Sequence, residues 1–105
     1  MFEFIETKLF TRLFDELFLD GELARLQATL IENPEVGDII PESGGIRKMR
    51  WGVPGRGKRG GLRIIYYLKS KQGQIWLLTL YPKSETGNIA GRVLKKIKVE
   101  IDGEN

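Results

Sequence analysis

The sequence predicts a single α+β domain, residues 1–105, in which an N-terminal helical hairpin packs on a small antiparallel β-sheet that is followed by a C-terminal helix. Two periodicities indicate this class. Apolar residues recur every three or four positions between residues 9 and 30, as in amphipathic helices, and alternate with polar residues in segments between 46 and 83, as in half-buried strands. Helices and strands that occupy separate runs of the chain are typical of α+β folds.

The N-terminal third is predicted to contain a short strand and two helices. "FEFI" at residues 2–5 is an apolar strand candidate, and the first helix covers residues 9–18. Asp20 is the expected N-cap of the second helix, residues 23–30. This helix ends before Pro34, because the residue that precedes a proline disfavours the α region. We expect the two helices to pair as an antiparallel hairpin.

Changes of period and turn residues place the remaining elements. Residues 34–45 contain prolines and glycines and are expected to form a loop. The glycine-rich segment 52–61 is expected to join two strands as a hairpin. The predicted strands are 46–51, 62–69 and 75–83, the last ended by Pro82, and the predicted C-terminal helix covers 89–101.

Alternation assigns the side chains of these strands to two faces of the sheet. The apolar face, which we expect the helices to cover, comprises Met49, Trp51, Leu62, Ile64, Tyr66, Leu68, Trp76, Leu78 and Leu80. The opposite face is cationic and aromatic and comprises Lys48, Arg50, Arg63, Tyr67, Tyr81 and Lys83. The glycine-rich segment adds three more cations beside this face, Arg56, Lys58 and Arg59.

The net charge of +3 conceals a strong asymmetry along the chain. Residues 1–46 carry ten acids and three bases, residues 47–83 carry ten bases and no acid, and residues 84–105 carry four of each. A long basic stretch without one acid indicates a polyanionic partner. The alternative is that these cations are solvated and only keep the protein soluble.

Composition excludes several classes of function. The chain has no cysteine and no histidine, which excludes disulfides, thiolate chemistry and the usual zinc sites, and we expect no cofactor. Acids stand where a signal peptide needs cations, and no apolar run approaches the ~20 residues that span a bilayer, so we expect a cytoplasmic protein with no membrane partner. "GRGKRGG" lacks the spacing of a phosphate-binding loop, which excludes a nucleotide hydrolase.

The cationic face has the residue types that RNA cleavage needs. RNA supplies its own nucleophile, the 2′-hydroxyl, so the protein has to place it, exchange protons and stabilise charge on the phosphorus-bound oxygens. Arginines stabilise such charge, a lysine among other cations can act as a base, and a tyrosine can donate a proton. Tyr67 and Tyr81 can also stack exposed bases. A face that only binds RNA or DNA has the same composition, so a non-catalytic nucleic-acid-binding module or repressor subunit remains the alternative.

At "GIRKMRWGVPGRGKRGGLRIIYY" and "IWLLTLYPKSETGNI", the sequence resembles the RelE superfamily of bacterial type II toxins, in its HigB-like branch. The likeness covers nearly the whole chain and includes the segment "ENPEVGDIIPESGG". The resemblance implies a helical hairpin on a small antiparallel sheet. It also implies ribosome-dependent cleavage of mRNA by attack of the 2′-oxygen, without metal, which inhibits translation. The implied partners are the ribosome with mRNA and an antitoxin from a neighbouring gene, often of the helix-turn-helix type. The protein would contact operator DNA only through this antitoxin.

The resemblance also implies roles for individual residues. The family places basic residues on the strand before the loop, matched by Lys48 and Arg50, and an arginine on the strand after it, matched by Arg63. A basic residue past the last strand is matched by Lys83. Ile89 stands where RelE has a tyrosine, and Tyr81 is the nearest substitute. We therefore expect Lys48, Arg50, Arg63, Tyr81 and Lys83 to be catalytic and Arg56, Lys58, Arg59 and Tyr67 to bind RNA, whereas the alternative for each is a solvated or packing role.

Overall fold

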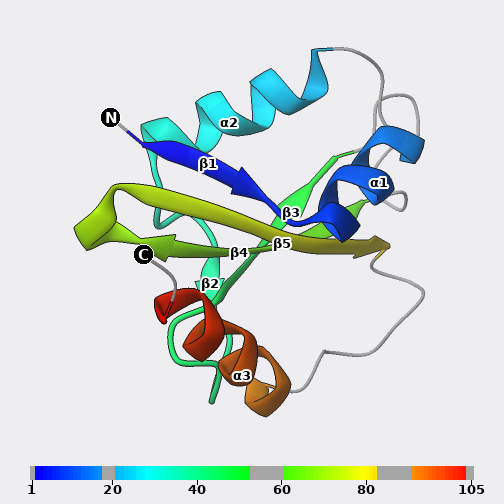
Figure 1. Ribbon diagram of the computed structural model, residues 1–105. Helices are drawn as coiled ribbons and strands as arrows, with labels where there is room; N and C mark the ends of the chain where they lie inside the picture. Colours follow the sequence, from blue (N-terminus) through cyan, green and yellow to red (C-terminus); the bar gives the residue numbers. More distant parts are fainter. Residues whose placement is uncertain (1, 18–20, 53–60, 83–90, 104–105) are drawn as a thin grey trace.

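The computed structural model describes residues 2–17, 21–52, 61–82 and 91–103. In this part of the chain it is an α+β structure with three helices and a five-stranded mixed sheet, so the predicted class is confirmed (Figure 1). In chain order the elements are β1 (Glu3–Glu6), α1 (Lys8–Leu17), α2 (Glu22–Glu32), β2 (Asp38–Ile39), β3 (Arg47–Trp51), β4 (Leu62–Lys69), the 3-10 turn η2 (Ser70–Gln72), β5 (Gln74–Pro82) and α3 (Gly91–Asp102).

The sheet has the strand order β1-β5-β4-β3-β2. The three long strands form the predicted antiparallel meander, but β1 lies parallel to β5, so the expectation of a purely antiparallel sheet is wrong at this edge. At the other edge, β2 pairs with β3 inside a segment that we expected to be a loop. A two-residue strand is too short for its period to be visible in the sequence.

Helices cover both faces of the sheet, α1 and α2 on one side and α3 on the other (Figure 1). Phe10 and Phe14 of α1 and Leu26 and Leu30 of α2 are buried against one face. On the opposite face, Leu94 and Ile101 of α3 are buried against Ile40, Ile46, Ile65 and Leu78. We expected this whole face to be cationic. Because α3 packs on it, only the part that α3 leaves uncovered is cationic.

A β-bulge corrects the predicted faces of β5. Ile65 pairs with Thr79 but Tyr66 pairs with Leu77, so Leu78 is an extra residue on β5. The extra residue shifts the alternation of side chains by one position. Leu80 therefore lies on the α1 and α2 side as predicted, whereas Leu78 and Trp76 pack on the α3 side, contrary to the prediction.

Glycines shape the ends of two helices. Gly21, with φ 92°, is the N-cap of α2, and no side chain caps the helix there; the expected cap, Asp20, lies outside the described residues. At the start of α3, a side chain on Gly91 would collide with the carbonyl oxygen of Pro41. None of the described helices is both long enough and apolar enough to cross a membrane.

Candidate nucleic-acid interface

Three predicted site residues form one row across the centre of the sheet. Arg50 on β3 is the register partner of Arg63 on β4, and Arg63 is the register partner of Tyr81 on β5. Residues that are directly opposite on neighbouring strands point to the same face, about 4.5–5.5 Å apart at their Cβ atoms. The register therefore places two arginine side chains and one tyrosine side chain next to one another on one face, although residues 51–62 separate Arg50 from Arg63 in the sequence.

Lys48 extends this row into a pocket at the β2 edge. It lies two residues before Arg50 on β3, on the same face, and its register partner is Asp38 on β2. An open pocket of about 510 Å³ lies here, lined by Val36, Asp38, Lys48, Met49, Arg50 and Arg63. The pocket thus has cations from β3 and β4 on one side and residues of β2 and the segment before it on the other.

The row and Lys48 have no neutralising partner among the residues that the structure describes. Within the described ranges, the side chains of Lys48, Arg50, Arg63 and Tyr81 make no ion pair or hydrogen bond. Like charges directly opposite each other on two strands destabilise a sheet. Arg50 and Arg63 are directly opposite each other, and this like-charge pairing lowers the stability of the sheet.

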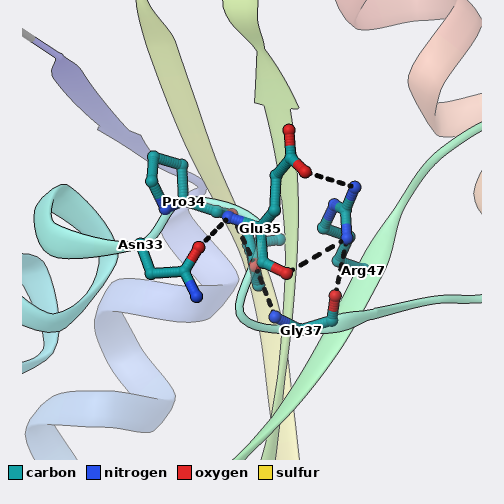
Figure 2. A network of polar contacts seen from close by, with 6 residues as sticks. Asn33, Pro34, Glu35, Gly37 and Arg47 are labelled. Atoms are coloured by element: carbon teal, nitrogen blue, oxygen red, sulfur yellow. Dashed lines mark hydrogen bonds and ion pairs between the residues drawn. The ribbon is translucent and has the colours of Figure 1, made fainter.

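A polar network fixes the segment that forms the β2 side of the pocket (Figure 2). Arg47 Nη1 donates hydrogen bonds to the carbonyl oxygens of Gly37, at 2.7 Å, and Glu35, at 3.3 Å. Its Nη2 lies 4.0 Å from the Glu35 carboxylate. The backbone N–H of Glu35 donates to Asn33 Oδ1 at 3.2 Å. Arg47 of β3 therefore holds the segment from Glu35 to Gly37, and Asn33 is joined to that segment through Glu35.

Tyr66 of β4 also holds this segment in place, through contacts with Pro34 and Gly37. Its side chain is fully buried, and its hydroxyl accepts a hydrogen bond from the N–H of Gly37 at 2.9 Å and donates one to the carbonyl oxygen of Pro34 at 2.7 Å. Burial raises the pKa of Tyr66, so the hydroxyl keeps its proton and remains a donor. A Cβ on Gly37 would lie 2.8 Å from both the Lys48 carbonyl oxygen and Tyr66 Cε1, so this close approach requires glycine.

Tyr67 lies on the predicted face but not with the row. Its hydroxyl donates to Asp102 Oδ1 of α3 at 3.0 Å, and Lys98 Nζ lies 5.7 Å from the centre of its ring. Lys98 also pairs with Asp102 at 2.9 Å. Burial, and then the hydrogen bond to Asp102, raises the pKa of Tyr67. These contacts give Tyr67 a role in docking α3, and its contact with RNA stays a prediction.

A buried lysine beside this cluster caps α3. Lys69, the last residue of β4, is 7% exposed, and its ammonium donates to the carbonyl oxygen of Ile101 at 3.0 Å. A cation at the C-terminal end of a helix stabilises the helix dipole. Part of the positive charge of residues 47–83 is therefore structural, and Lys69 and Arg47 do not belong to the exposed row.

Arg56, Lys58, Arg59 and Lys83 lie outside the described residues. Sequence reasoning did not identify Asp38 as a pocket residue, because residues 34–45 were expected to form a loop. The apolar alternation in "GDIIP" covers too few positions to predict a strand there. Among the residues that the structure describes, no three acids gather closely enough to hold a metal ion.

No family model matches this sequence.

Proposed function

We propose that this protein is the toxin of a type II toxin–antitoxin system, a HigB-like member of the RelE superfamily that cleaves mRNA on the ribosome. The row of Arg50, Arg63 and Tyr81, with Lys48 beside it, is the observation that carries the proposal. Lys48, Arg50 and Arg63 are at positions that the resemblance assigns to the site, Tyr81 is the nearest substitute for the tyrosine that RelE has at the position of Ile89, and the four side chains share one face although they come from three strands. In this proposal α1 and α2 form the N-terminal hairpin of the RelE-like arrangement.

The proposed chemistry needs no group beyond RNA and these side chains. Arg50 and Arg63, whose side chains the strand register places next to each other, bind the scissile phosphate and stabilise the additional negative charge of the transition state. Lys48 and Tyr81 are the two groups that can exchange protons with the 2′-hydroxyl and the leaving 5′-oxygen. The bond from the 2′-oxygen to phosphorus forms while the bond to the 5′-oxygen breaks, which leaves a 2′,3′-cyclic phosphate.

The proposed setting is the bacterial cytoplasm, where the ribosome presents mRNA to the cationic face. A toxin there has to be silenced, so we propose a small antitoxin from an adjacent gene as the stable partner. Purification of the tagged protein from its native host should recover this partner. Recovery of the chain alone would count against a toxin–antitoxin pair.

Induction of the gene in bacteria tests the proposed function. The wild type should stop growth within a few generations, with transcripts cut inside codons. The Arg50→Ala/Arg63→Ala double variant, at equal soluble level, should permit growth, whereas Arg12→Ala should remain toxic because Arg12 is an exposed cation on α1, across the sheet. Normal growth with intact transcripts under the wild type would contradict the proposal. Binding of RNA without cleavage would favour a non-catalytic binding module.

A further inference from the structure

The pocket beside Lys48 has two chemically different sides. Lys48, Arg50 and Arg63 line it from the central strands, which suits phosphate oxygens. Val36, 42% exposed, and Asp38 line it from the β2 side. A ligand that is anionic throughout would be repelled by Asp38. A nucleotide has a phosphate for the first side and a base with a flat face and polar edge for the second.

Asp38 is held in this position by the backbone around it. Its pairing with β3 places it at the register position of Lys48, and the preceding Gly37 is fixed through the hydrogen bonds of its N–H to Tyr66 and of its carbonyl oxygen to Arg47. In the described part of the chain, the Asp38 carboxylate forms neither an ion pair nor a hydrogen bond. Both of its oxygens are therefore available as acceptors on the rim of a cationic pocket.

We propose that Asp38 is a specificity-determining residue that binds the Watson–Crick edge of guanine. A carboxylate has two acceptor oxygens side by side, and they match two parallel N–H groups, as in its bidentate pair with arginine. Guanine presents such a pair in N1–H and the 2-amino group, whereas uracil, cytosine and adenine place an acceptor beside each donor on this edge. Proteins read single-stranded RNA through these edges. The inference rests on the proposed function, because it takes RNA as the ligand.

A coupling experiment on both partners tests the contact. The probes are short 2′-fluoro oligonucleotides, which lack the attacking hydroxyl, with guanine at one position or hypoxanthine, which lacks the 2-amino group. Binding is measured by fluorescence anisotropy for the wild type, Asp38→Ala and Asp15→Ala. Asp15 is the matched control, because it is an exposed aspartate on α1, on the other side of the sheet. Circular dichroism checks that each variant is folded.

The expected result is a loss of binding that depends on Asp38. Loss of one hydrogen bond to a charged acceptor should weaken binding of the hypoxanthine probe about tenfold for the wild type and Asp15→Ala. For Asp38→Ala the two probes should bind within about twofold of each other, and the guanine probe should bind more weakly than to the wild type because both of its hydrogen bonds to the carboxylate are gone. Equal losses for wild type and Asp38→Ala would overturn the inference and leave the proposed function standing. Absence of RNA binding by the wild type would overturn the inference, whereas the proposed function is tested separately by cleavage of mRNA on the ribosome.

Discussion

Replacement of Tyr66 by phenylalanine should destabilise the protein far more than the same replacement at Tyr67. The Tyr66→Phe variant loses the hydrogen bond to the Pro34 carbonyl and leaves the buried N–H of Gly37 without its acceptor. An unpaired buried donor costs about 1–3 kcal/mol and a lost hydrogen bond about 0.5–1.5 kcal/mol. We expect the free energy of unfolding to fall by about 2–4 kcal/mol, and the melting temperature by roughly 10 °C or more.

Tyr67→Phe is the matched control, because it removes the same atom from the next residue. The Tyr67 hydroxyl and the Asp102 carboxylate that it contacts are exposed to water, so its loss should cost less than about 1 kcal/mol. Urea unfolding followed by circular dichroism measures both variants, and an unchanged dependence on urea shows that the same surface unfolds. Equal stability of the two variants would refute the claim that Tyr66 anchors the β2 side of the pocket.

Two further predictions concern the docking of α3. Gly91→Ala should lower the melting temperature, because its methyl group collides with the Pro41 carbonyl oxygen; an unchanged melting temperature would show that the start of α3 can move away freely. Burial disfavours the Asp102 carboxylate, but hydrogen bonds from Lys98 and Tyr67 outweigh it and hold its pKa below the ordinary value of 3.8. The stability that these partners contribute is therefore present above pH 3.8 and lost as pH falls below it. The difference in unfolding free energy between the wild type and Asp102→Asn should shrink as pH falls below 3.8. A constant difference from about pH 6 to about pH 2 would contradict this prediction.

The central part of the fold could be predicted because its pattern is local. The strand expected at residues 62–69 is β4 itself, and alternation placed Met49, Trp51 and Ile64 correctly against the N-terminal helices. Arg50 and Arg63 were also placed correctly on the opposite face, because strand period and register fix both residues.

The errors came from contacts between distant parts of the chain. Nothing local indicates that β1 returns beside β5, or that α3 covers one end of the cationic face. The bulge at Leu78 reversed the face of Trp76, since one extra residue shifts every side chain beyond it. Asp38 needs the pairing of β2 with β3 to reach the pocket, and the register of a two-residue strand cannot be derived from its sequence.

Single-turnover cleavage of mRNA on programmed ribosomes tests the central claim, that the arginine row stabilises the transition state of RNA cleavage. Arg63 is half-buried between Arg50 and Tyr81, and its replacement relieves a like-charge contact, so Arg63→Ala should melt at or slightly above the wild-type temperature. Its cleavage rate should fall about 10²–10³-fold, the usual effect of removing one preorganised stabilising group. Arg12→Ala should cleave at the wild-type rate. Cleavage by a well-folded Arg63→Ala protein at the wild-type rate would contradict the account.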